Sequence, residues 1–127
     1  MTSRRRPATL RAHSSAPERW SVDAGGAEVA HLDIPAHATR QRTFEIDCRF
    51  VVMHRGAGPA WHAMRVLVDG AQEWSRRVPT HDGDHDSLDL RFRRTVPVGR
   101  PLRVTATGEA GGATRLALAI SAEEDAG

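Results

Sequence analysis

Hydrophobic and polar residues alternate along most of this chain in short stretches. The clearest stretch is residues 42–53, RTFEIDCRFVVM. It places five apolar side chains on one face: Phe44, Ile46, Cys48, Phe50 and Val52. Alternation with a period of two is typical of a β-strand that has one face in a hydrophobic core and the other in water. Residues 42–53 are therefore expected to form a long strand.

Seven further segments carry the same kind of pattern, two of them more weakly. They are residues 19–23, 27–34, 63–68, 72–79, 87–96, 100–107 and 113–121. Gly, Pro and Asp separate them every eight to twelve residues, and no stretch of ten or more residues has helical spacing. The sequence predicts an all-β fold: an antiparallel two-sheet sandwich, jelly-roll or Ig-like, with about 7–8 strands in a single domain over residues 18–122.

Two details of the strand 72–79 follow from its neighbours in the sequence. The preceding Asp69-Gly70 pair suits a tight hairpin turn, because both residues tolerate positive φ angles. In strict alternation Arg76 shares the face of Trp74 and Val78. We therefore expect a β-bulge near Arg76 and Arg77.

The two ends of the chain differ from its body. Residues 1–17 are rich in Arg, Ser, Ala and Pro without periodicity and are predicted to be a disordered, basic, flexible arm, although an edge strand at residues 8–12 is an alternative. Residues 123–127 are predicted to be an acidic tail. Five arginines and one acid fall within residues 1–20, so of the 18 basic and 16 acidic residues 13 and 15 remain in the body. The body is not basic, and a nucleic-acid partner is not expected.

Composition also bears on the setting of the protein. The chain has abundant Ala, Arg and Gly and lacks Lys, Asn and Tyr, as expected of a GC-rich bacterial genome. Its single cysteine, Cys48, excludes an intramolecular disulfide, suits a reducing compartment, and lies among apolar neighbours typical of a buried, inert thiol. No apolar run is long enough to cross a bilayer. We expect a cytoplasmic protein with no membrane association.

The loop THDGDHD, residues 80–86, has the residue types of a metal site. Its candidate ligands are His81, Asp82, Asp84, His85 and Asp86. Alternate aspartates resemble the start of a calcium loop, but Ser87 and Arg93 stand where an EF-hand needs Gly and Glu. A transition metal could instead take the two imidazoles and a carboxylate. The sequence thus allows one divalent ion, calcium or a transition metal, or an acidic turn that bonds its own backbone.

Antiparallel strands place successive loops at alternate ends of a sandwich. Loops 54–62, 80–86 and 108–113 should share one end, with the turn at Asp69 and the loop 96–101 at the other. This arrangement makes His54, Trp61 and His62 candidate ligand-binding residues beside the aspartate loop. An indole exposed there could stack on a sugar, or it could pack across the open end of the sandwich.

The outward-facing residues bear on partners. The outward arginines are interleaved with Glu45, Asp47 and Asp89, which favours cross-strand ion pairs over nucleic-acid binding: Arg49, Arg65, Arg91, Arg93 and Arg103. Val51, Met53 and Leu67 are apolar on the outward faces. They suggest a homo-oligomer or a protein partner, because water-exposed apolar residues are usually covered.

No nucleophile or phosphate-loop motif is present in the sequence. The pattern as a whole favours a non-catalytic β-sandwich module of a bacterial cytoplasmic protein that binds a ligand or a partner chain through one loop end or a sheet face. The alternative is a small metal-dependent, cupin-like enzyme with His and Asp ligands on the loop rim. Cupin-like sites place histidines on strands that face the barrel interior, and here the candidates lie mainly in loops.

Overall fold

The computed structural model describes residues 16–125, and within them the chain forms strands without helices. The eight strands are β1 (Arg19–Asp23), β2 (Val29–Ile34), β3 (Arg42–Met53), β4 (Trp61–Val68), β5 (Ala71–Pro79), β6 (His85–Val96), β7 (Leu102–Gly111) and β8 (Thr114–Glu124). Each predicted segment overlaps one of them, and β4 to β8 extend beyond the predicted bounds. The all-β prediction is confirmed, and β8 continues two residues into the segment predicted to be an acidic tail.

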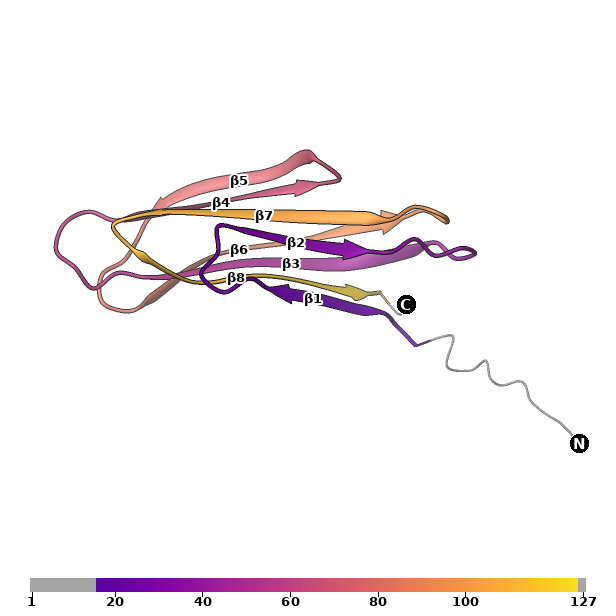
Figure 1. The fold of residues 1–127 in the computed structure, drawn as a ribbon, viewed down its shortest axis with the longest axis horizontal. Helices are drawn as coiled ribbons and strands as arrows, with labels where there is room; N and C mark the ends of the chain where they lie inside the picture. Colours follow the sequence, from indigo (N-terminus) through magenta and orange to yellow (C-terminus); the bar gives the residue numbers. More distant parts are fainter. Residues whose placement is uncertain (1–15, 126–127) are drawn as a thin grey trace, which may run out of the picture.

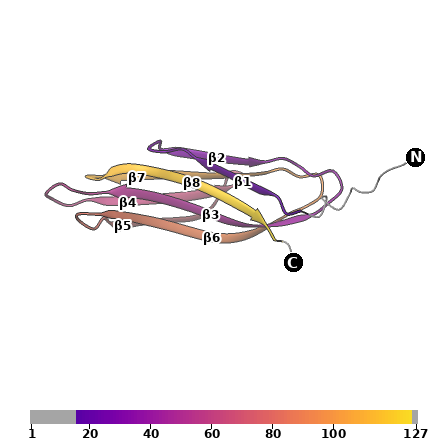
Figure 2. The same ribbon diagram turned by 90° about the horizontal axis from the view of Figure 1, so that it is seen from below.

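The strands form two antiparallel four-stranded sheets packed face to face (Figure 1). Sheet A has the order β1-β8-β3-β6, and sheet B has the order β2-β7-β4-β5. Strands therefore pair as first with last, second with seventh, third with sixth, and fourth with fifth. This nesting is the jelly-roll arrangement, in which one long hairpin is rolled into two layers. Figure 2 shows the strands of both layers following the long axis of the molecule.

The inner faces of the two sheets make one hydrophobic core. The five apolar residues of β3 that alternation placed inward are all 0% exposed. They meet Met64, Val66 and Val104 of sheet B, which are also buried. Cys48 lies in this core, and burial, with a smaller contribution from the charge of Asp47, raises the pKa of its thiol to about 12. The thiol is therefore protonated at neutral pH and unreactive.

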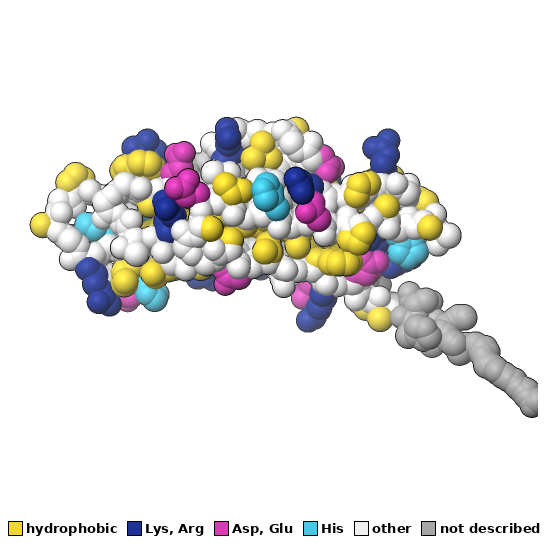
Figure 3. Space-filling view, viewed as in Figure 1, with side chains coloured by type: hydrophobic (Ala, Val, Ile, Leu, Met, Phe, Trp, Pro, Cys, Tyr) yellow, Lys and Arg dark blue, Asp and Glu magenta, His cyan; other side chains and the backbone are white. Residues whose placement is uncertain are grey.

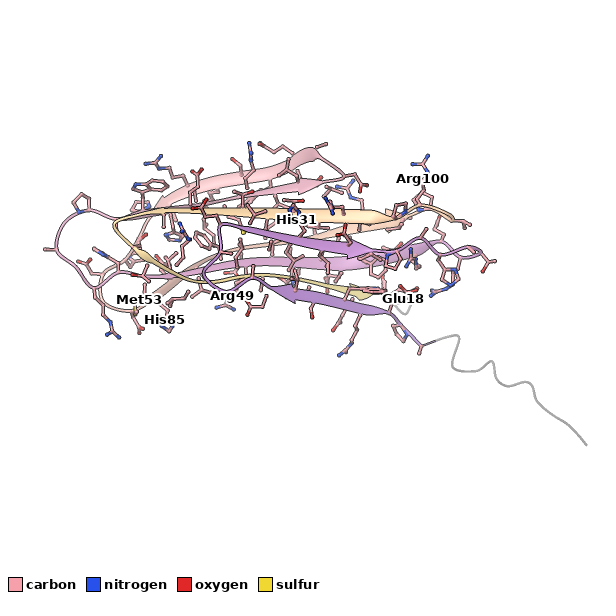
Figure 4. The ribbon with its side chains drawn as sticks, viewed as in Figure 1. Glu18, His31, Arg49, Met53, His85 and Arg100 are labelled. Atoms are coloured by element: carbon pink, nitrogen blue, oxygen red, sulfur yellow. The ribbon has the colours of Figure 1, made fainter. Side chains whose placement is uncertain are left out.

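The loops divide between the two ends of the sandwich as the strand count requires. Backbone hydrogen bonds join the loop after β3 to the loop after β5: Gly83 N–H donates to the carbonyl of His54, and Thr80 N–H donates to that of Ala60. At the opposite end, Asp69 N–H donates to the carbonyl of Arg103. Figure 4 shows Met53 and His85 near the first end and Glu18 and Arg100 near the second. We call the first end the loop end.

The hairpin turn between β4 and β5 forms as predicted, but the bulge does not lie where we expected it. Asp69 and Gly70 have φ angles of 50° and 84°. The register shifts between Val66 and Leu67, opposite the start of β5, and Arg76 pairs regularly with Met64. No bulge is needed at Arg76, because β5 is an edge strand and the long side chain reaches water past the margin of the core.

A second register shift, between Val51 and Val52, lies opposite β8 and leaves Leu116 without a partner on β3. Leu116 is half-buried, whereas Leu118 and Ile120 are buried as alternation predicts. Bulges of this kind let a long strand bend toward the end of a sandwich.

The three outward apolar residues do not form one patch. Val51 and Met53 lie on the outer face of sheet A, while Leu67 lies on the outer face of sheet B. All three are half-buried by neighbouring side chains. These residues therefore do not form one oligomerisation surface, and a homo-oligomer or a protein partner stays a prediction.

A cluster of charges closes the end opposite the loop end, where β1 begins and β8 ends. Arg42 is 2% exposed, and its guanidinium donates to the Glu18 carboxylate at 2.7 Å and to the carbonyl of Pro35 at 2.8 Å. Arg40 bridges Glu18 and Glu124. These contacts fasten β1 and β8 to the loop between β2 and β3.

Candidate ligand-binding site

His54 is a structural residue of the loop end. Its side chain is 2% exposed, and its Nε2 lies 3.0 Å from the carbonyl oxygen of Gly58 and 2.8 Å from the Oδ1 of Asp82. The ring thereby ties the loop after β3 to the loop after β5. A histidine buried in this way does not face an incoming ligand.

His62, the first inward-facing residue of β4, is also enclosed. It is 0% exposed, its Nδ1 lies 2.7 Å from the hydroxyl of Thr80, and its ring meets that of Phe50 edge to face. Burial lowers the pKa of this imidazole, although the nearby Asp86 acts in the opposite direction. Of the three residues predicted to bind a ligand, only Trp61 reaches the surface.

Two aspartates between the end of β5 and the start of β6, Asp84 and Asp86, are bonded to the backbone of their own segment, while Asp82 pairs with His54. Asp86 accepts hydrogen bonds from the backbone N–H groups of His81 and Ser87, and Asp84 accepts one from that of His85. Within residues 16–125, no group of three or more His, Cys, Asp or Glu side chains is arranged to hold a metal ion. A divalent ion at this loop stays a prediction, and thermal melting with and without EDTA would test it.

The outer face of sheet B has a hollow that is lined mainly by polar and charged side chains. Its volume is about 260 Å³, and Ala63 of the central strand β4 forms its floor. Cross-strand pairing puts Glu109 of β7 and Arg77 of β5 on the two sides of Ala63. One row further along, Arg65 stands between two hydroxyl residues, Thr107 and Ser75. We call this the sheet B hollow.

Trp61 lies beside the hollow on the side nearest the loop end and contacts Arg77, which lines it. It precedes Ala63 by two residues on β4 and so lies on the same outer face. Its indole covers the backbone of Gly111, where a Cβ atom would lie only 2.1 Å from the indole Nε1. The guanidinium carbon of Arg77 lies 3.7 Å from the centre of the Trp61 ring. Because Gly111 has no side chain, the indole can lie against the backbone at this position. In this place the indole contacts the guanidinium of Arg77, which lines the hollow.

The charged side chains of the hollow have no ion-pair partner among the described residues. On the outer face of sheet A, arginines pair with carboxylates across the strands: Arg19 with Glu123, Arg49 with Asp89, Arg91 with Asp47 and Arg93 with Asp125. On sheet B, Arg103 pairs with Asp33. In contrast, Arg65, Arg77 and Glu109 make no ion pair or hydrogen bond with any other residue of the described chain. Figure 3 shows basic side chains interspersed with acidic ones over one face of the molecule.

Two other hollows lack this feature. The one on the outer face of sheet A is lined by Asp47, Arg49, Asp89 and Arg91, which neutralise one another in pairs. The other lies beside Trp20, where the side chain of Arg103 is already engaged by Asp33 at 2.7 and 3.1 Å. Only the sheet B hollow, among the three, leaves its cations and its carboxylate available to a ligand.

Sequence reasoning did not find this site. It placed Trp61 among the candidates but expected it in a loop, and it assigned Arg65 to a cross-strand ion pair. The residues of the hollow come from β4, β5 and β7, which are not all consecutive in the chain. In the sequence, these residues are marked only by their outward-facing positions in the alternating pattern. Every exposed strand residue has such a position.

Comparison with known proteins gives the fold and no family. No family model and no curated protein matches the chain. Among solved structures, dimeric latent PorU from Porphyromonas gingivalis superposes with a TM-score of 0.56 over 83% of this chain at 13% identity, and the chain spans 10% of that protein. This likeness shows a shared fold. Two looser matches each have a TM-score of 0.41 and 12% identity. A family 35 carbohydrate-binding module from Clostridium thermocellum is matched over 83% of this chain and 97% of that one. The VP2 subviral particle of infectious bursal disease virus is matched over 85% of this chain and 33% of that one.

Proposed function

We propose that this chain is a non-catalytic binding module whose ligand occupies the sheet B hollow. One observation carries the proposal: Arg65, Arg77 and Glu109 converge on the hollow and have no protein partner among the described residues, although every arginine on the outer face of sheet A has one. Charged side chains that converge without partners on a rigid sheet are suited to bind a polar ligand.

Binding without catalysis is supported by the placement of the titratable residues. His54 and His62 face inward and hold the loop end together, and His31, on the outer face of sheet B, has its Nδ1 3.0 Å from the hydroxyl of Thr105. The lining of the hollow consists of three arginines, a glutamate, two hydroxyl residues, an alanine and a methionine. They lie on three strands that are fixed by hydrogen bonds on both sides of β4. Such a set recognises a ligand by charge and hydrogen bonding.

A filled hollow tests this proposal. Replacing the floor residue, Ala63→Phe, places a ring in the hollow and removes no charged group. Ala119→Phe is the matched control, because Ala119 lies beside Arg49 on the outer face of sheet A. Fluorescently labelled protein is applied to an array of defined glycans and peptides. We expect the unmodified chain and the Ala119→Phe variant to bind the same features, and the Ala63→Phe variant to lose them.

Two outcomes would overturn the proposal. In one, the unmodified chain binds no feature of the array. In the other, the Ala63→Phe variant, shown to be folded by its amide NMR spectrum, binds as the unmodified chain does. In the second case the ligand site lies elsewhere, and the loop end becomes the next surface to test.

The wider setting of the module stays a prediction. We infer a bacterial cytoplasmic protein from the composition and the single cysteine. In the part of the chain that the structure covers, no helix has the length and apolar character to cross a membrane. A homo-oligomer is a further prediction, and light scattering at micromolar concentration tests it: a monomer there would refute it.

A further inference from the structure

The best-placed group in the hollow is the guanidinium of Arg77. Stacking on Trp61 fixes its plane, and no described residue accepts its hydrogen bonds. An arginine fixed by an aromatic ring keeps its donors directed outward in a planar fork, and this fork matches the two oxygens of a carboxylate. The conformational cost of ordering the arginine has been met before a ligand arrives. Arg77 is therefore ready to receive an anion.

The other charges limit how negative this ligand can be. Arg65 adds a second positive charge, while Glu109 faces Arg77 across Ala63 and adds a negative one. Arg76 also lines the hollow, so its three arginines and one glutamate give a net charge of two positive units. A polyanion such as a nucleic acid would meet Glu109 with its next phosphate, which costs energy, whereas a singly charged ligand would not.

The position of the hollow disfavours a peptide. Extended peptides gain affinity by pairing with the free backbone of an edge strand. The hollow lies over β4, whose backbone is already paired with β5 on one side and β7 on the other. A ligand in the hollow must therefore be bound by side chains alone. It needs several polar groups to form hydrogen bonds with these side chains.

The remaining lining residues fit the hydroxyl groups of a sugar. Glu109 can accept hydrogen bonds from hydroxyls, and Ser75 and Thr107 can both donate and accept them. Ala63 offers a small apolar floor for the C–H face of a ring. We infer that the sheet B hollow binds a sugar that carries a carboxylate, with the carboxylate on Arg77 and the hydroxyls on Glu109, Ser75 and Thr107. The inference rests on the proposed function and names its ligand class.

A matched pair of sugars tests this inference. D-glucuronate has a carboxylate where D-glucose has a hydroxymethyl group, and the two sugars are otherwise identical. Each sugar is titrated into isotope-labelled protein, and the amide resonances of Ala63, Ser75 and Thr107 are followed by NMR. We expect both sugars to act on the same amides, and glucuronate to bind at least about tenfold more tightly, because a charge-assisted bidentate contact replaces a neutral one. Acetate and inorganic phosphate are titrated as anions without a ring.

Two arginine variants provide the internal control. Arg77→Gln should bring the affinity for glucuronate down to that for glucose. Arg91→Gln removes an exposed arginine on sheet A and should leave both affinities within about twofold. Arg77→Lys keeps the charge but loses the planar fork, and should give an intermediate affinity.

The outcomes separate this inference from the proposed function. If the two sugars bind the hollow equally well, the carboxylate assignment is overturned and the binding module stands. If acetate or phosphate binds as tightly as glucuronate, the sugar assignment is overturned. If the sugars leave the hollow unchanged while an acidic peptide from the array perturbs it, the ligand class is wrong and the function stands. If none of these probes perturbs the hollow, both fall.

Discussion

Replacing Glu18 by Gln should destabilise the fold by about 2 kcal/mol at neutral pH. Glu18 is the carboxylate partner of Arg42, whose side chain is 2% exposed and whose Nε has no hydrogen-bond partner among the described residues. Removing one partner of a buried ion pair costs about 3–5 kcal/mol, because the remaining charge is left in a medium of low dielectric constant. Glu18 is 22% exposed, and glutamine retains one acceptor oxygen. We therefore expect a loss of about 2 kcal/mol, which is below the range for a fully buried pair.

The effect should depend on pH in a defined direction. Burial alone would raise the pKa of Glu18, but hydrogen bonds from Trp20 and Arg42 and the charges of Arg42 and Arg40 outweigh it and lower this pKa below 4.5. A carboxylate with a depressed pKa stabilises the fold fully above its unfolded-state pKa and loses that contribution as the pH falls through the folded-state value. The difference between the two proteins should therefore shrink from pH 5 to pH 3.

Urea denaturation followed by circular dichroism measures both effects. Glu123→Gln is the control, since the Arg19–Glu123 pair has side chains that are 78% and 60% exposed and should contribute less than about 0.5 kcal/mol. A Glu18→Gln variant as stable as this control at pH 7 would refute the reasoning. A loss that stays constant down to pH 3 would show that shape rather than charge is responsible.

Three further predictions concern single residues. Gly111→Ala should displace the indole of Trp61 and release Arg77, with a shifted indole N–H resonance in the NMR spectrum and a loss of about 1 kcal/mol of stability; an unchanged resonance would contradict the packing described here. Cys48, with its pKa near 12, should react with Ellman's reagent at pH 8 only after urea unfolds the chain, and rapid labelling of the folded protein would refute its burial. Burial lowers the pKa of His62, so its neutral form stabilises the fold above about pH 6.5 and this contribution is lost as the pH falls. His62→Gln should therefore lose less stability between pH 7 and pH 5 than the unmodified chain.

The strands were predictable because alternation is a local property. The apolar face of β3 could be identified from its own residues, and the Asp69-Gly70 turn from the φ angles that these two residues tolerate. The alternation of loops between the two ends followed from strand number alone. None of these inferences needed to know which strands become neighbours.

The hollow was not predictable, because it depends on strand neighbours. Arg65 and Arg91 look alike in the sequence, since both are outward arginines within a strand. Arg91 lies opposite Asp47 on β3 and is neutralised, whereas Arg65 lies between Thr107 and Ser75. The difference arises from pairing between segments that are distant in the chain. The misplaced bulge has a similar origin, because the edge position of β5 cannot be known from its own residues.

The nested pairing of the strands also has a consequence for how the chain folds. The hairpin of β4 and β5 needs only a two-residue turn, whereas the contact between Glu18 and Glu124 joins residues 106 positions apart. Each inner pair, once formed, shortens the loop that the next pair must close, so we expect the order of formation to run outward from the central hairpin. The strands that carry Ala63 and Arg77 would then be ordered early, and β1 would join β8 last. Unfolding should start at that final seam, so weakening the contacts of Glu18 should speed unfolding and leave the folding rate nearly unchanged.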